Sequence, residues 1–239
     1  GEMQIAILLE QMRREGFEVL VSRPEVIFQK AEDGSVLEPI ETLYAEIPSF
    51  ALGDIMGNLA GRKAEIEDMK PNGDNTSIRA AIPTRGLIGF ETDLQNLTKG
   101  MGIISHLFRE YGPFRGEIPA RINGVLVALE PGTSTAYALD GLQERGTLFV
   151  GPQEEIYAGM VVGENSRPAD MVVNPCKSKH LTNMRSQGDG KGIQLSPPLK
   201  HSLERALEYL AEDEYLEVTP KNLRFRKKIL DHTKRKRSE

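Results

Sequence analysis

The stretches TLYAEIPSFALGDIMGNLAGRKAEI (residues 42–66) and SIRAAIPTRGLIGFETDLQNLTKGMGIISHLF (residues 77–108) repeat one pattern. Each begins with apolar residues at every second position, which is typical of a half-buried strand, and reaches a proline. Each continues with apolar residues at the spacing of an amphipathic helix, then a glycine, then a second strand pattern. Strand–helix–strand twice over predicts a ferredoxin-like split βαβ domain over residues 41–111, an antiparallel sheet with two helices on one face.

The second strand of this domain is acidic. Glu65, Glu67 and Asp68 follow one another there, which indicates an edge strand or a solvated face. A Pro- and Gly-rich connection over residues 112–119 follows the fourth strand and predicts a domain boundary.

The remaining residues, 112–239, show a different order of elements. We expect a strand near 125–129, a helix over 134–145, strands at 147–150 and 156–163, and a helix capped by Ser202. Strands at 215–218 and 223–225 close the pattern. The fold class of the whole chain is therefore predicted as α+β, with a mostly antiparallel α+β domain after the ferredoxin-like one.

The first 40 residues begin with a helical pattern. Ile5, Leu8, Leu9 and Met12 share one helical face, and an alternating strand over residues 17–21 follows. The apolar face starts almost at the first residue without a cap. We therefore expect residues 1–40 to be the end of a domain whose earlier part lies upstream.

Residues 174–198, NPCKSKHLTNMRSQGDGKGIQLSPP, form a long polar segment without a pattern of its own. Such a segment is either a flexible surface loop or a functional one. Its cations suit phosphate groups, and its Asn and His side chains suit base edges or 2′-hydroxyls. The candidate contacts in it are Lys177, Lys179, His180, Asn183, Arg185 and Lys191.

The last 19 residues are basic although the protein has a formal net charge of −5. They hold nine Lys or Arg against two acids, so the rest of the chain is strongly acidic. A basic tail is often merely solvated, but a basic loop and tail on an acidic body also fit a partner that carries phosphates. Lys200, Lys227 and Lys228 are further candidate RNA contacts on this reasoning.

Several function classes find no support in the sequence. One cysteine, Cys176, allows no internal disulfide and fits a reducing compartment, and no apolar run reaches the roughly 20 residues of a membrane helix. We expect a cytoplasmic protein without a membrane partner. Neither a catalytic constellation nor a set of metal ligands is apparent, and no phosphate-binding GxxxxGK[ST] motif occurs. We therefore predict no catalytic, cofactor or metal site in this chain.

Two long segments resemble a known family. YAEIPSFALGDIMGNLAGRKAEIEDM (residues 44–69) and AAIPTRGLIGFETDLQNLTKGMGIISHLFREY (residues 80–111) resemble the fifth domain of elongation factor G-like translational GTPases. The first residues resemble the end of the third domain of such factors. From GEIPARINGVLVALE (residues 116–130) to LEYLAEDEYLEVTPKNLRFRKK (residues 207–228), the chain is similar to the C-terminal domain peculiar to the BipA/TypA family.

This resemblance implies a function. The chain would be the C-terminal part of a ribosome-associated GTPase involved in ribosome function or assembly and stress adaptation, with GTP and Mg²⁺ bound in absent N-terminal domains. It implies that loop 174–198 reaches the acceptor end of transfer RNA and that other parts dock on ribosomal RNA, without DNA as a partner. From the resemblance alone, the turn with Arg62 and Lys63 is a further candidate RNA contact, as is Arg85.

Two other functions stay open on the sequence. Split βαβ domains often pair and bind small molecules between their helices, so the chain could be a dimeric sensing module, although this leaves the basic loop unexplained. It could also be a free-standing RNA-binding protein. Ribosome binding at increasing salt, with Lys177, Lys179 and Arg185 replaced by Ala, separates the three.

Overall fold

The computed structural model describes residues 2–118, 121–178 and 193–238. The chain forms two compact units. The first unit comprises Gly1–Arg23 and Ala120–Glu239, and the second unit comprises Pro24–Pro119. This grouping differs from the predicted boundaries, because the first helix and strand pack with the C-terminal part of the chain and form no body of their own.

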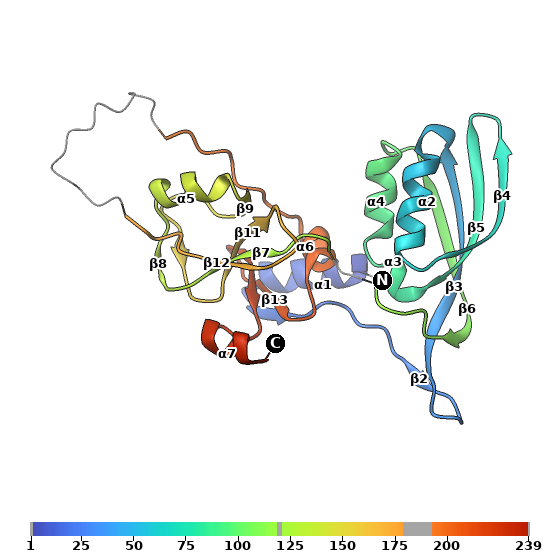
Figure 1. The fold of residues 1–239 in the computed structure, drawn as a ribbon, viewed down its shortest axis with the longest axis horizontal. Coiled ribbons are helices and arrows are strands. Elements are labelled where there is room, and N and C mark those ends of the chain that lie inside the picture. Colours follow the sequence, from blue (N-terminus) through green and yellow to red (C-terminus); the bar gives the residue numbers. More distant parts are fainter. Residues whose placement is uncertain (1, 119–120, 179–192, 239) are drawn as a thin grey trace. The chain divides into compact units, whose positions relative to one another are not determined.

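The second unit has the predicted ferredoxin-like order of elements. Its strands pair only antiparallel, in the order β6-β3-β5-β4, with β2 beside the start of β3. Helices α2 and α4 lie on one face of this sheet (Figure 1). The elements are β2 (Gln29–Lys30), β3 (Val36–Pro48), η1 (Ser49–Ala51), α2 (Leu52–Gly61), β4 (Glu65–Asn72), β5 (Asn75–Pro83), α3 (Thr84–Leu87), α4 (Phe90–Leu97) and β6 (Ile103–Pro113).

The core of the second unit follows the periodicity of the sequence. The alternating residues of β3 and β5 and the apolar stripes of the two helices are buried, including Leu43, Ile55, Ile82 and Leu94, each 0% exposed. The acidic strand β4 lies at the edge of the sheet and pairs only with β5, as its composition predicted. The second predicted helix is divided into α3 and α4, because Gly89 takes a φ of 71°, outside the helical region.

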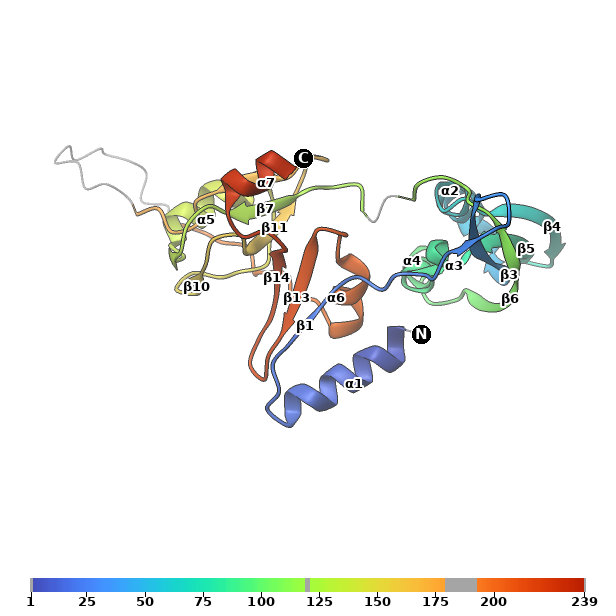
Figure 2. The ribbon, with the colours of Figure 1, turned by 90° about the horizontal axis from the view of Figure 1, so that it is seen from below.

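The first unit begins with α1 (Glu2–Arg14), which lies beside α6 (Leu203–Tyr209) and a three-stranded sheet (Figure 2). That sheet has the order β1-β13-β14, with β1 (Val19–Val21), β13 (Glu214–Val218) and β14 (Leu223–Lys227). Helix α1 buries Ala6 and Leu9, whereas Ile5 and Leu8 are 40% and 57% exposed. The predicted buried face is therefore confirmed at Leu9 and wrong at Ile5 and Leu8, because contact with α6 selects the face that carries the small Ala6.

The rest of the first unit contains a four-stranded sheet, a two-stranded sheet of β8 and β10, and the helices α5 and α7. The sheet order is β12-β7-β11-β9, and β12 pairs parallel with β7, which the mostly antiparallel prediction allowed for. Ser202 caps α6 as predicted, since its hydroxyl accepts from the Arg205 N–H. The elements are β7 (Val125–Ala128), β8 (Gly132–Thr133), α5 (Ala136–Gln143), β9 (Gly146–Leu148), β10 (Glu155–Ile156), β11 (Val161–Asn165), β12 (Met171–Val173) and α7 (His232–Ser238).

Candidate nucleic-acid interface

Hydrogen bonds from Thr135 hold the beginning of segment 174–198 in place. The Thr135 hydroxyl donates to the carbonyl oxygen of Lys177 over 2.7 Å, and the Thr135 N–H donates to the carbonyl of Pro175 over 3.0 Å. Thr135 is also the cap of α5, where its oxygen accepts from the Ala138 N–H. The Lys177 side chain is exposed, so this cation reaches solvent from a backbone position that Thr135 holds in place.

The segment returns onto the other end of the same helix. The Gln143 amide donates to the carbonyl of Gln194 over 3.0 Å and accepts from the Ser196 N–H over 3.1 Å. The Leu199 N–H then donates to the carbonyl of Leu148 over 2.8 Å. Both ends of the segment are therefore fastened around α5 and β9. The candidates Lys179, His180, Asn183, Arg185 and Lys191 lie outside the described residues.

Two further candidates are exposed on the first unit. Lys200 follows the fastened Leu199, and its side chain is open to solvent. Lys228 is also exposed, with its ammonium 5.2 Å from the centre of the Tyr215 ring. Neither side chain has an ion pair within the part of the chain that the structure describes. Both remain candidates for phosphate contacts.

Lys227 is not available as an RNA contact, so this prediction is wrong. Its residue is only 2% exposed, and its ammonium lies 2.6 Å from Asp170 Oδ2, 2.7 Å from Asp213 Oδ2 and 2.9 Å from Glu214 Oε1. Burial opposes the charge of Lys227, but the three carboxylates outweigh it and raise its pKa above the ordinary value. The alternation of β14 turns this cation inward, where it pairs with the buried Glu214 and with the more exposed Asp170 and Asp213.

The centre of this buried charge cluster is Glu214, which is 0% exposed. Arg121 donates to both carboxylate oxygens of Glu214, Nη1 over 2.7 Å and Nη2 over 2.6 Å. Burial favours the neutral carboxyl, yet the hydrogen bonds and charges of Arg121 and Lys227 prevail and lower the pKa of Glu214. Through Arg121, which precedes β7, the cluster links that part of the first unit to the end of α6 and to the strands β13 and β14. Its role is therefore structural.

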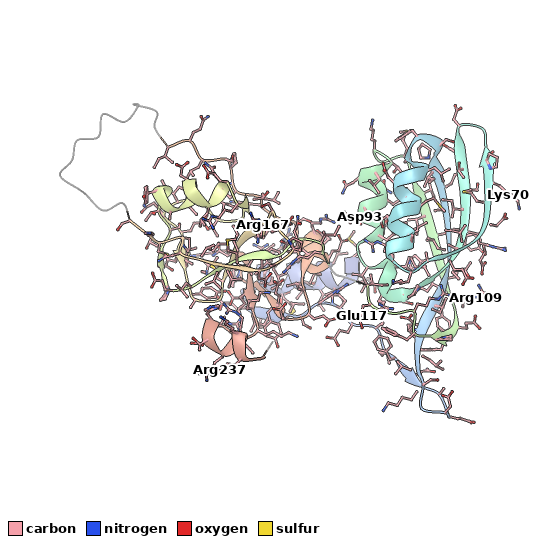
Figure 3. All side chains as sticks on the ribbon, in the orientation of Figure 1. Lys70, Asp93, Arg109, Glu117, Arg167 and Arg237 are labelled. Atoms are coloured by element: carbon pink, nitrogen blue, oxygen red, sulfur yellow. The ribbon has the colours of Figure 1, made fainter. Side chains whose placement is uncertain are left out.

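Arg62 is likewise committed to internal contacts. Its guanidinium donates to the Asn58 side chain, to the carbonyl oxygens of Gly86 and Ile88, and to Asp93 Oδ2, each over 2.7 Å. Asp93 lies on α4 (Figure 3), so Arg62 ties the end of α2 to the break between α3 and α4. The prediction that Arg62 contacts RNA is therefore wrong, because a phosphate would have to displace four hydrogen bonds.

Lys63 and Arg85, the other two candidates of the second unit, differ in whether their charge is free to meet a phosphate. Lys63 is exposed and has a φ of 60°, so it projects from the turn after α2 and remains available. Arg85 is held by Glu38, whose carboxylate is 0% exposed, with 2.5 Å between Arg85 Nε and Glu38 Oε2. Only Lys63 of this group fits a contact with an external polyanion.

The basic tail forms helix α7, which the sequence did not predict. Asp231 Oδ1 accepts from the Lys234 N–H over 2.8 Å and so begins the helix, and Arg235 donates to the carbonyls of Ile229 and Leu230 over 2.7 Å. Arg237 lies on this helix (Figure 3) and is exposed, as are Lys234 and Lys236. The Asp three residues before Lys234 was the signal for this helix.

Other site classes find no support in the described residues. No group of three or more His, Cys, Asp or Glu residues is placed to hold a metal ion there. Within the same ranges, no helix is both long and apolar enough to cross a membrane. The first unit also contains a cavity that the sequence did not predict.

Two family models match consecutive parts of the chain. Residues 35–122 match the family described as elongation factor G C-terminus, and residues 123–232 match the TypA/BipA C-terminal domain. Large ribosomal subunit assembly factor BipA of Bacillus subtilis is 44% identical over 241 residues, which cover 100% of this chain and 39% of that protein.

Proteins with the same name in other bacteria are similar to this chain to nearly the same degree. The one of Synechocystis is 42% identical over 95% of this chain and 38% of its own length, and the one of Salmonella typhimurium is 42% identical over 100% and 39%. The chain thus spans about 39% of the length of these curated relatives.

Proposed function

The chain belongs to the TypA/BipA family, and on that premise we propose that its two units bind the ribosome in the cytoplasm. The relatives are named as assembly factors of the large ribosomal subunit, which supports a role in ribosome assembly or function. The chain contributes binding, and GTP hydrolysis belongs to a domain that is not among its two units.

We assign the contact with ribosomal RNA and with the acceptor end of transfer RNA to segment 174–198 and the cations near it. The observation that carries this assignment is the double fastening of the segment, by Thr135 at one end and Gln143 at the other. A segment held at both ends presents its cations from a fixed base, which lowers the conformational entropy lost on binding. Exposed Lys177 and Lys200 stand near the two described ends of the segment and add positive charge there.

We expect binding of the chain to large ribosomal subunits to weaken steeply with salt. If several phosphates are neutralised, the log–log slope of affinity against salt is a few units, and replacing Lys177, Lys179 and Arg185 by Ala lowers it by about 2 to 3. Co-sedimentation with large subunits at increasing salt measures this slope.

The matched control replaces three exposed cations elsewhere, Lys30, Lys99 and Arg145, by Ala. This variant has the same change in net charge, but its cations lie outside segment 174–198, so it should keep the slope of the unmodified chain. Equal slopes in both triple variants would contradict the assignment of segment 174–198. For the transfer-RNA contact, an acceptor-stem minihelix with its single-stranded 3′ end should compete better than one trimmed flush, and equal competition would remove that contact.

A further inference from the structure

The first unit contains a cavity of about 380 Å³ that none of the functions above uses. It lies between the end of α1, the segment 199–201, the residues after β9, and β14, and all its walls belong to one compact unit. Its size lies within the range of small-ligand sites in proteins. Leu199, the residue that follows segment 174–198, lines the cavity, and its N–H donates to the carbonyl of Leu148.

One wall of the cavity is aromatic. The rings of Phe149, His201 and Phe225 line it, with 4.9 Å between the ring centres of Phe149 and His201 and 5.4 Å between those of His201 and Phe225. Tyr209 stacks on His201 at 5.1 Å and supports it. Phe149 and His201 are only partly buried, so their rings are accessible from the cavity. The Phe149 and His201 rings meet edge to face, at 83° to each other, so a nucleobase stacked on Phe149 would present its edge to the His201 ring.

The His201 side chain also presents an unused polar atom. Its Nε2 is buried and has no hydrogen-bond partner among the described residues. Burial and the nearby Arg205 lower the pKa of His201, so the imidazole is neutral at neutral pH and can donate or accept one hydrogen bond. An unsatisfied buried nitrogen in a cavity wall indicates a polar ligand or water.

The rim of the cavity carries cations. Lys200, Lys221 and Arg224 line it and have no ion pair in the described part of the chain, whereas Arg13 is held by Glu10 and by the Pro220 carbonyl. Two carboxylates, Glu154 and Glu155, also line the cavity, and Glu154 accepts from the Gly151 N–H over 2.8 Å. The three unpaired cations favour an anionic group on their side, and the acids suit the N–H groups of a base.

We propose that this cavity binds one unpaired nucleotide of RNA. The phosphate pairs with Lys200, Lys221 and Arg224. The base stacks on the Phe149 ring, and His201 Nε2 forms a hydrogen bond with a polar atom at the edge of the base. This inference rests on the proposed RNA-binding function and adds a built pocket for a single base. Stacking on a rigid wall together with phosphate contacts is how single-stranded nucleic acid is held without a duplex.

The test is a titration of the whole 239-residue chain with adenosine 5′-monophosphate, observed through the imidazole C–H signals of His201 in NMR. His201→Gln assigns those signals. We expect a saturable shift, and at least a tenfold weaker affinity when Lys221 and Arg224 are both replaced by Ala. The pair Lys30→Ala and Arg145→Ala, with the same charge change outside the cavity, should bind as the unmodified chain does.

Inorganic phosphate is the second probe. It should shift the His201 signals less than the nucleotide does, because it has no base to stack. If phosphate alone reproduces the full shift, or if neither probe saturates, the assignment of a nucleotide pocket is overturned.

Large-subunit co-sedimentation separates this inference from the function on which it rests. A chain that sediments with subunits but gives no nucleotide shift refutes the pocket and leaves the proposed function intact. A chain that gives the shift but does not sediment refutes ribosome binding and leaves a nucleotide site. If both hold, the Lys221 and Arg224 double variant should lose subunit affinity beyond the control pair, and equal loss in both refutes the pocket as a ribosomal contact.

Discussion

Replacement of Glu214 by Ala is expected to lower the free energy of unfolding of the first unit by about 3–5 kcal/mol, the usual cost of removing one partner of a buried ion pair. Arg121 and Lys227 would keep their charges while losing the carboxylate that both contact. Lys227 is 2% exposed, so its ammonium would stay out of water with only Asp170 and Asp213 as partners. Differential scanning calorimetry should show the transition of this unit lowered by on the order of 10 °C.

The neighbouring acid provides the control for Glu214. Glu212 is exposed and has no ion pair in the described residues, so Glu212→Ala should leave the transition close to that of the unmodified chain. Hydrogen exchange of the β13 amides locates the effect, because these amides should lose protection in Glu214→Ala alone. A Glu214→Ala protein with an unchanged transition would show that the cluster is not a structural centre.

The same carboxylate predicts a pH dependence. Burial raises the pKa of Glu214, but the hydrogen bonds from Arg121 and the charges of Arg121 and Lys227 lower it further, so it lies below the ordinary value of 4.5. A group with a lowered pKa in the folded state stabilises above its unfolded pKa and loses this effect as the pH falls through the folded value. The difference in transition temperature between the unmodified chain and Glu214→Ala should thus be constant above pH 5 and shrink below 4.5. A difference independent of pH down to 3 would contradict this account.

Replacement of Arg62 by Ala is expected to destabilise the second unit by about 2–4 kcal/mol, since it removes several charged hydrogen bonds to partly buried acceptors. The carbonyls of Gly86 and Ile88 lie where α3 ends, and Arg62 Nη1 donates to each of them over 2.7 Å. The guanidinium also lies 5.5 Å from the centre of the buried Phe90 ring. Loss of Arg62 should therefore loosen the connection between α2 and α4.

Lys63 is a control of equal charge one residue away. Lys63→Ala should leave the transition of the second unit unchanged, because the Lys63 side chain is exposed. Arg62→Lys should be nearly as damaging as Arg62→Ala, since an ammonium cannot reproduce the planar fork of the guanidinium. If Arg62→Ala weakened binding to large ribosomal subunits without lowering the transition, the original assignment of Arg62 as an RNA contact would be restored.

The sequence predicted those features that depend on neighbouring residues. The alternation of β3 and β5, the cap at Ser202 and the edge position of the acidic β4 all follow from local spacing and composition, and the structure confirms them. The resemblance to the BipA/TypA family is also carried by contiguous segments, and both family matches confirm it. The assignment of Lys179, His180, Asn183, Arg185 and Lys191 to RNA stays a prediction.

The errors concern charged residues whose partners are distant in the chain. Lys227 belongs to a basic stretch, and Arg62 was a candidate by resemblance alone. Neither signal shows whether a cation faces solvent or an acid within the fold. Arg62 meets Asp93 across 31 positions and Arg121 meets Glu214 across 93, so only the packed structure brings them together. The exposed face of α1 and the cavity beside Phe149 arise in the same way, from several elements at once.

From the sequence alone came the succession of strands and helices, the family, and the segment expected to meet RNA, because backbone preference and side-chain periodicity act over a few residues. Only the tertiary structure decided which cations remain free, how the chain divides into units, and where a cavity forms. Those properties depend on the desolvation of each charge and the nearness of its counter-charge, and both are set by contacts between segments far apart in the sequence.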